Sequence, residues 1–335
     1  MSSSNFRKDI VSGDWILIAP SIKKKPNFFG KSSKRPNAPQ GSCPFEDPQK
    51  AGHGKPIYWL SKAGAVEKDP ASWFVQAIPN KFPVLTEQKA CPVVLSEGPY
   101  KTMKGVGFQE IVITRDHERS LGFMNNDEIS LVVKTYIERY KALKKEKCVE
   151  YILIFHNNGP TAGASVGHPH SQIFALPIVP TDVSRSLAGS EKYFSKHKIC
   201  VHCAVIKKEL KDAKRVIYEN KNFVVLCPYA SKVSFEIRLF PKLHSPNFER
   251  LRGEESEEFV DALFATFSKL KNAMNDPDYN FFIHTSPVKG TGHYHWHMEI
   301  LPRTSIWAGF ELGTGIEILK VLPEDAAQIL KNAKI

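Results

Sequence analysis

The sequence has no apolar run long enough to span a bilayer, and its first residues lack the apolar core of a signal peptide. No arginine-rich tract or interleaving of basic and aromatic residues marks a nucleic-acid module. A formal net charge of +11, carried mostly by lysine, nevertheless suits anionic ligands such as nucleotides. We therefore expect a cytoplasmic protein that does not enter membranes and for which nucleic acid is a weak alternative partner.

Cysteine is also scarce, with six residues in a chain of 335. In a reducing compartment these residues are expected to be thiols or metal ligands rather than disulfides. Cys200 and Cys203 are separated by two residues, which lets both thiolates reach one tetrahedral zinc ion. This spacing predicts a zinc site, with a redox-active dithiol as its main competitor.

The chain carries a weak internal repeat. His117 and His168 are 51 residues apart (168 − 117), and His244 and His295 are also 51 residues apart (295 − 244). Each pair brackets the same order of patterns: a strand that leads to the first histidine, a helix with an apolar stripe, a second strand and a loop. In the first half the helix has its stripe between Ile129 and Tyr140, with Asn126 or Asp127 as the expected N-cap.

Equal spacing and matching element order predict two α+β domains of one architecture, each an antiparallel sheet with a packed helix. Proline interrupts the strand pattern at Pro177-Ile178-Val179-Pro180, which places the boundary there. We therefore predict a catalytic domain over residues 1–180 and a second domain over residues 181–335. The strand-like runs of the first 100 residues are expected to extend the first sheet.

The repeat also nominates metal ligands. In the second half His244 and His295 would complete a zinc site with the two cysteines, iron being the other metal that remains open. In the first half the same positions hold one cysteine, and Glu46 stands where the second cysteine would be. Either this site binds metal through a carboxylate, or it has lost its metal and His117 is only hydrogen-bonded. The two predicted structural sites are Cys43, Glu46, His117 and His168, and Cys200, Cys203, His244 and His295, with His284, His293 and His297 as alternative ligands in the second half.

The segment His168-Pro169-His170-Ser171-Gln172 carries the candidate chemistry. Alternation by two places both histidines and the glutamine on one face of an extended strand. If His168 binds a metal, His170 is free to act as a nucleophile, because neutral imidazole can attack phosphorus near pH 7. We predict a covalent nucleotidyl-histidine at His170.

Gln172 bears on the type of reaction. Its amide can donate a hydrogen bond to a phosphoryl group but cannot give up a proton to a basic leaving group. The site therefore favours exchange between phosphate-type partners over hydrolysis. The loop 157–165 is expected to bind phosphate oxygens through backbone N–H groups and the Ser165 hydroxyl. The second-half counterpart, His297 with Glu299, places a negative charge where phosphate would lie, so only the first half is expected to be catalytic.

Gly163-Ala164-Ser165, followed by the His-Pro-His-Ser-Gln segment, closely resembles the most specific signature of the galactose-1-phosphate uridylyltransferase family, a branch of the histidine-triad superfamily. The similarity covers nearly the whole chain. The resemblance implies a homodimer with two half-barrel-like α+β motifs per chain. Other similar segments are Arg7-Lys8-Asp9, residues 13–20, Lys34-Arg35-Pro36, Asn80-Lys81-Phe82-Pro83 and residues 308–315.

The family resemblance also implies a ping-pong reaction. A UDP-sugar would uridylylate His170 and release a sugar 1-phosphate, and a second sugar 1-phosphate would then take the UMP. Gln172 would orient the transferred group. By position, Arg35 and Asn80 would lie beside the nucleoside, Asn157 and Ser165 would contact phosphates, and Phe310 and Glu311 would belong to the segment that contacts the sugar phosphate, often across a dimer interface.

Two departures from the family pattern leave alternatives open. Glu46 puts the first metal site in doubt. Ser171 is also found in relatives that use phosphate as acceptor, such as those resembling ADP-glucose phosphorylase. The leading hypothesis is exchange between UDP-glucose and galactose 1-phosphate. The alternatives are an ADP-glucose or dinucleoside polyphosphate phosphorylase with the same covalent histidine, and, more remotely, a zinc-stabilised nucleotide-binding or nucleic-acid-binding module without catalysis.

Overall fold

The computed structural model describes residues 4–20, 39–65, 72–88, 90–290 and 292–335. Within these ranges, no helix combines the length and the apolar composition that crossing a membrane requires. The residues form mixed α and β structure, as the sequence predicts.

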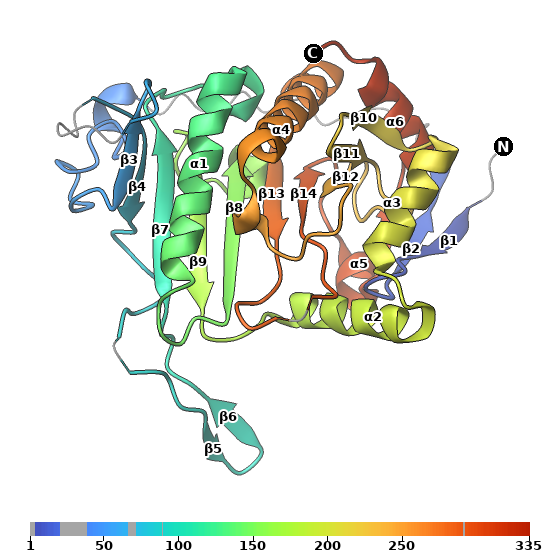
Figure 1. Ribbon diagram of the computed structural model, residues 1–335, viewed down its shortest axis with the longest axis horizontal. Helices are drawn as coiled ribbons and strands as arrows, with labels where there is room; N and C mark the ends of the chain where they lie inside the picture. Colours follow the sequence, from blue (N-terminus) through green and yellow to red (C-terminus); the bar gives the residue numbers. More distant parts are fainter. Residues whose placement is uncertain (1–3, 21–38, 66–71, 89, 291) are drawn as a thin grey trace.

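The main element is one ten-stranded sheet in which every neighbouring pair is antiparallel. Strands of the two halves lie side by side in it (Figure 1). From edge to edge the order is β10 (Val216–Glu219), β11 (Phe223–Leu226), β12 (Ile237–Pro241), β14 (His297–Pro302), β13 (Tyr279–His284), β8 (Tyr151–Asn158), β9 (His170–Leu176), β7 (Phe108–Thr114), β4 (Trp73–Pro79) and β3 (Tyr58–Ser61).

The two predicted halves are therefore joined rather than built on separate sheets. β8 of the first half pairs with β13 of the second, with Phe155 opposite Phe282. Their helices, α1 (Asn126–Leu143) and α4 (Gly253–Met274), contact each other and cover the same face of the sheet (Figure 1). One apolar core runs beneath both helices and includes Ile154 and Trp296. Pairing across the junction satisfies two strand edges that separate sheets would expose.

The N-cap of helix α1 is an asparagine, as expected, but it lies one residue earlier in the sequence. Asn125, not Asn126 or Asp127, is the N-cap, because its Oδ1 accepts a hydrogen bond from the Glu128 backbone N–H at 2.9 Å. The Glu128 carboxylate accepts in return from the Asn125 N–H at 3.1 Å. This capping box satisfies two donors of the first turn. The apolar stripe, including Ile129 and Tyr136, is buried as predicted.

Shorter elements complete the fold. β1 (Asn5–Lys8), β2 (Trp15–Ile18) and β15 (Glu317–Leu319) form a small sheet that joins the two ends of the chain. The hairpin of β5 (Leu95–Glu97) and β6 (Tyr100–Thr102) projects from the body (Figure 1). The remaining helices, α2 (Thr181–His197), α3 (Val201–Asp212), α5 (Gly309–Thr314) and α6 (Pro323–Asn332), lie on the side of the second half.

One expectation about the cysteines is wrong. Cys91 and Cys148 form a disulfide with their Cα atoms 5.3 Å apart. The fold brings together two residues that are 57 positions apart in the sequence, a proximity that no local spacing motif could reveal. The bond ties the segment before β5 to the turn after α1. Cys43, Cys200, Cys203 and Cys227 form no disulfide.

Candidate active site

The predicted catalytic residues lie on β9, on the sheet face opposite α1. His170 pairs with Ile113 and Gln172 with Ile111 on β7, so all four side chains share this face. His168 precedes the strand. Ile111 and Ile113 pack there with Phe45, whose ring centroid lies 5.0 Å from that of His170. The predicted alternation therefore holds for His170 and Gln172.

A backbone carbonyl fixes the tautomer of His170. Its Nδ1 lies 2.9 Å from the His168 carbonyl oxygen, which can only accept, so Nδ1 carries the proton and Nε2 keeps its lone pair. Burial lowers the pKa of His170, although the bond to His168 opposes this shift. The lowered pKa favours the neutral imidazole near neutral pH, and the bond to His168 leaves Nε2 as its single nucleophilic nitrogen.

Ser171 lies on the other face of β9 and does not meet the reacting groups. Its Oγ is hydrogen-bonded to the Tyr136 hydroxyl at 2.5 Å and to Nδ1 of His156 at 3.0 Å, and all three residues are buried. Ser171 therefore joins the sheet to α1. Its identity cannot select an acceptor by direct contact.

Gln172 has a partner that sequence reasoning missed. Nε2 of Gln109, on β7, donates to Oε1 of Gln172 at 3.0 Å. Oε1 of Gln109 in turn accepts from the Val84 backbone N–H at 2.9 Å. Gln109 is buried, with 8% of its surface exposed. The sequence held one signal for this contact: alternation along the strand places Gln109 on the same face as Ile111 and Ile113.

The glycine-rich loop is tied to the second half of the chain. Asp278 accepts from the Thr161 N–H at 2.8 Å and from the Thr161 hydroxyl at 2.6 Å. Gly159 has φ +86°, and a Cβ there would lie 1.8 Å from the Asp278 carboxylate. Nδ2 of Asn280 donates to Oδ1 of Asn157 at 2.7 Å. Sequence reasoning missed both supporting residues, because they are more than 100 positions away.

These contacts correct one expectation about the loop. The N–H groups of residues 161–164 already donate to Asp278 or to carbonyls within the loop. They cannot also form the expected phosphate cradle without breaking those bonds. Ser165 remains exposed at the end of this segment, as a phosphate contact would require.

The other predicted substrate residues are not all brought to this face. The Asn80 N–H donates to the Gln109 carbonyl at 3.1 Å, which places Asn80 beside β7 next to the site. Phe310 and Glu311 lie in α5, on the side of the second half and away from β9 (Figure 1). A single chain therefore does not unite them with His170. Arg35 lies outside the described residues.

The first predicted metal tetrad is assembled. One ligand atom from each of Cys43, Glu46, His117 and His168 lies within 4.8 Å of the others. Nε2 of His168 is 2.7 Å from the Thr114 carbonyl, so it carries the proton and Nδ1 faces the tetrad. Nδ1 of His117 lies 2.6 Å from the Glu46 carboxylate. The donor set suits zinc, and the orientation of His168 is that of a metal ligand.

The second tetrad has the same construction with two sulfurs. Cys200, Cys203, His244 and His295 each bring one ligand atom within 4.8 Å of the others. Nε2 of His244 and of His295 lie 2.7 and 2.9 Å from backbone carbonyls, which again turns both Nδ1 atoms toward the cysteines. A hydrogen bond from the Cys203 thiol is the main cause that lowers the pKa of Cys200 to about 3. This set also fits zinc.

The alternative ligands of the second half lie elsewhere. His293 packs against the Phe194 ring at 4.1 Å. His284 and His297 lie around Glu299 in a separate group, whose ligand atoms are within 4.8 Å of one another. Arg238 already neutralises this cluster, because its Nε lies 3.0 Å from carboxylate oxygens of both Glu299 and Glu236.

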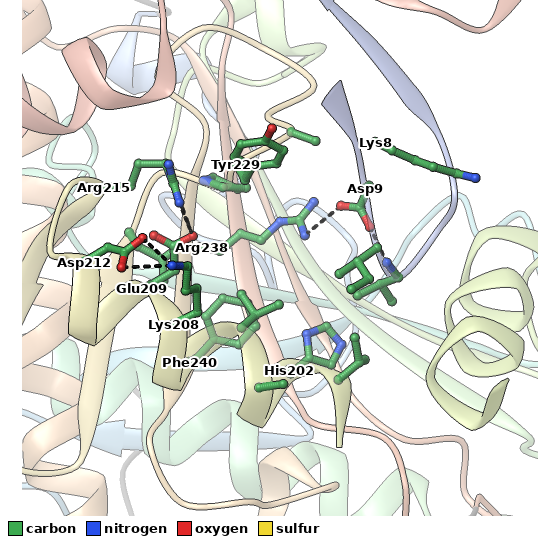
Figure 2. Close-up of a pocket in the computed structure, with 18 of the residues that line it drawn as sticks. Lys8, Asp9, His202, Lys208, Glu209, Asp212, Arg215, Tyr229, Arg238 and Phe240 are labelled. Atoms are coloured by element: carbon green, nitrogen blue, oxygen red, sulfur yellow. Dashed lines mark hydrogen bonds and ion pairs between the residues drawn. The ribbon is translucent and has the colours of Figure 1, made fainter. Parts of the chain in front are cut away.

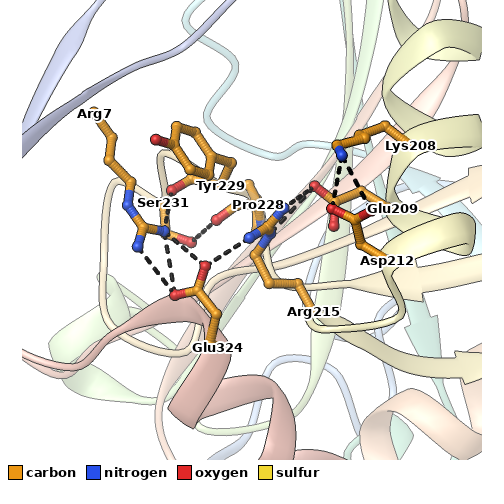
Figure 3. Close-up of polar contacts among 9 residues, drawn as sticks. All are labelled: Arg7, Lys208, Glu209, Asp212, Arg215, Pro228, Tyr229, Ser231 and Glu324. Carbon is orange, nitrogen blue, oxygen red and sulfur yellow. Dashed lines mark hydrogen bonds and ion pairs between the residues drawn. The ribbon is translucent and has the colours of Figure 1, made fainter.

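A cavity of about 760 Å³ lies beside this cluster, between α3, β11 and β12 and the first strand (Figure 2). Its buried cations are already paired with carboxylates. Arg238 reaches Asp9 at 3.5 Å, and Arg215 binds Glu209 and Glu324, each at 2.6 Å (Figures 2 and 3). A phosphate bound here would have to displace these carboxylates. The cavity is therefore a poor match for the phosphoryl chemistry predicted for the first half.

Comparisons with known proteins find relatives along nearly the whole chain. Residues 1–180 match the galactose-1-phosphate uridyl transferase N-terminal domain, and residues 107–333 match a domain of unknown function, DUF4921. The ADP-glucose phosphorylase of Arabidopsis thaliana is 33% identical over 99% of this chain and 94% of that protein. The galactose-1-phosphate uridylyltransferase of Thermotoga maritima is 27% identical over 98% of both chains. A crystal structure of the Arabidopsis ADP-glucose phosphorylase with bound ADP-glucose has a TM-score of 0.83 at 31% identity, covering 99% of this chain and 100% of that chain.

Proposed function

The chain belongs to the galactose-1-phosphate uridylyltransferase family, a family of nucleotidyltransferase-type enzymes, and we propose that it moves a nucleotidyl group from a nucleotide sugar to a phosphate-type acceptor through His170. The observation that carries this proposal is the bond between Nδ1 of His170 and the His168 carbonyl. It leaves Nε2 as the attacking nitrogen, on the face that also presents Gln172.

In the first half-reaction, Nε2 of His170 attacks the α-phosphorus of the nucleotide sugar. The P–N bond forms as the bond from phosphorus to the bridging oxygen breaks, and a sugar 1-phosphate leaves. In the second half-reaction an oxygen of the acceptor phosphate attacks the same phosphorus and the P–N bond breaks. Neither leaving group needs a proton, which agrees with a glutamine rather than an acid at position 172.

Two metal sites support this arrangement in our proposal. Zinc held by Cys43, Glu46, His117 and His168 would supply structural cross-linking. His168 lies two positions before the nucleophile, and its carbonyl orients His170. The second set would hold α3 against the loop that carries His244.

The leading specific reaction is exchange between UDP-glucose and galactose 1-phosphate, the type of activity for which the Thermotoga relative is named. A second candidate is ADP-glucose phosphorolysis, which the 33% identity to the Arabidopsis enzyme favours. Either enzyme would act as a homodimer in the cytoplasm, with Phe310 and Glu311 supplied to the partner's site. Such a dimer would account for the separation of α5 from β9 within one chain.

Parallel assays distinguish the two reactions. The purified protein is incubated with UDP-glucose and galactose 1-phosphate, and separately with ADP-glucose and inorganic phosphate. Formation of UDP-galactose supports the first, and formation of ADP supports the second. Turnover in neither assay, together with no labelling of His170 by either nucleotide sugar in folded protein, would contradict the proposed function.

A further inference from the structure

The orientation of the Gln172 amide is determined by a chain of hydrogen bonds that starts at the backbone. The Val84 N–H can only donate, so the atom of Gln109 that it meets at 2.9 Å must be the amide oxygen. The amide nitrogen of Gln109 then faces Gln172 and donates to it at 3.0 Å. The atom of Gln172 that accepts must be its oxygen. Its Nε2 therefore points away from Gln109.

This orientation matters for phosphoryl transfer. Gln172 and His170 share one face of β9 at alternate positions. Within the described part of the chain, Nε2 of Gln172 forms no hydrogen bond. The amide N–H of Gln172 can donate a hydrogen bond to a phosphoryl oxygen, whereas its amide oxygen in the same position would repel that oxygen. A free glutamine would sample both orientations, since its two ends have nearly the same shape.

We propose that Gln109 is a positioning residue for nucleotidyl transfer: it holds Gln172 with its N–H₂ group toward the phosphoryl group bound at His170. This inference rests on the proposed function of His170. Gln109 does not touch the reacting atoms and acts only through Gln172. Burial of Gln109 and its bond to the Val84 backbone give the pair a rigid anchor.

The second half of the chain supports the inference that Gln109 and Gln172 act together. His168 and His295 are 127 positions apart (295 − 168), and the same offset relates Gln109 to Glu236 and Gln172 to Glu299. Both members of the pair are carboxylates there, and Arg238 bridges them at 3.0 Å on each side. The two side chains are thus polar and linked in both halves, through a hydrogen bond between amides in the first half and through a guanidinium in the second.

The test compares two substitutions of Gln109, one to a side chain that can only accept a hydrogen bond from Gln172 and one to an apolar side chain. Gln109→Glu keeps the bond from Val84 but offers Gln172 only an acceptor, which turns the Gln172 amide around. Gln109→Met removes the bond and leaves that amide free to rotate. We expect labelling of His170 to slow about 100-fold in Gln109→Glu, the effect of losing one transition-state donor, and about tenfold in Gln109→Met. The Kd of the nucleotide sugar should change less than about threefold, because the lost contact acts on the transition state.

A double-mutant cycle separates positioning from general damage. In a Gln172→Leu background, Gln109→Glu should cause no further loss, because the amide that it misdirects is absent. Gln76 is a buried glutamine on β4 that is bonded to Gln49 and not to Gln172. The variant Gln76→Glu therefore controls for the negative charge that Gln109→Glu adds. Thermal unfolding checks that each variant is folded, and Gln109→Met carries the test if Gln109→Glu does not fold.

Labelling of wild-type protein by UDP-glucose or ADP-glucose is the separate condition on which the proposed function depends. If wild-type protein is labelled but folded Gln109 variants react at the wild-type rate, the inference is overturned and the function stands. Equal losses in Gln109→Glu and Gln109→Met, or full additivity with Gln172→Leu, would also overturn it.

Discussion

The two halves of this chain place different chemistry on the same scaffold. In the first half a strand presents His170 and Gln172, and the glutamine is held by a neutral amide. In the second half the equivalent strand presents His297 and Glu299, and Arg238 binds the carboxylate. Although burial opposes ionisation, Arg238 holds the pKa of Glu299 well below its usual range. In our proposal a histidine on the equivalent strand is therefore not sufficient, because the charge beside it determines whether a phosphate can approach.

The halves also depend on each other. The loop before the catalytic strand is anchored by Asp278 and Asn280 of the second half. Strands β8 and β13 pair directly, and one core lies beneath α1 and α4. The second half therefore contributes to the structure of the first half.

The largest expected difference concerns the metal sites. Cys203→Ser should remove one of two zinc ions per chain and lower the free energy of unfolding by several kcal/mol, because zinc binding is coupled to folding. Cys43→Ser in the first half should cost less, since that site has one thiolate rather than two. Elemental analysis and thermal unfolding measure both effects. Wild-type protein without zinc, or unchanged zinc content in Cys203→Ser, would contradict the assignment.

Making the first half resemble the second should abolish most of its activity. In Gln172→Glu the bond from Gln109 can persist, but the carboxylate repels the transferred phosphoryl group. We expect His170 labelling to slow about 100-fold. Gln328→Glu, an exposed change on α6, is the matched control and should leave the rate unchanged. Labelling at the wild-type rate in Gln172→Glu would refute the role given to the neutral amide.

The ion pairs of Glu324 should make the fold sensitive to acid. Burial opposes ionisation of Glu324, but hydrogen bonds from Arg7 and Arg215 outweigh it and lower the pKa of this carboxyl (Figure 3). Its contribution is therefore present above the unfolded pKa of about 4.3 and is lost as pH falls through the lower, folded pKa.

Glu324→Gln should lower the free energy of unfolding at pH 7 by about 1–2 kcal/mol, between the values typical of exposed and buried ion pairs. The difference in the free energy of unfolding between this variant and wild type should become smaller as the pH falls below about 4. Denaturant unfolding at several pH values measures this difference. A gap that stays constant or widens in acid would show that Glu324 does not stabilise the fold through its charge.

The smallest expected effect concerns the counterpart of the nucleophile. His297→Asn should leave the rate of His170 labelling within about twofold of wild type, because His297 lies in the other half among paired charges. Labelling rate and thermal unfolding are measured together. Complete loss of labelling in a folded His297→Asn protein would refute the assignment of catalysis to the first half.

Sequence reasoning predicted the features that depend on spacing and periodicity. The repeat located both predicted ligand tetrads, because equal spacing marks equivalent positions in the two halves. The apolar stripes located α1 and α4, because helical period is a local pattern. It did not predict the joining of β8 to β13, the disulfide of Cys91 with Cys148, or the anchoring of Gln172 by Gln109. These contacts depend on how distant segments meet. The predicted phosphate cradle was wrong in part for the same reason, since Asp278 takes a donor that the loop alone would leave available.

The central claim is that the nucleotidyl group is carried by His170 and by no group of the second half. The direct measurement is to incubate the protein with radiolabelled UDP-glucose or ADP-glucose, digest it, and locate the adduct by tandem mass spectrometry. The account predicts a single acid-labile phosphoramidate on His170, absent from His170→Ala. An adduct on His297, or none on any residue of folded protein with either nucleotide sugar, would contradict it.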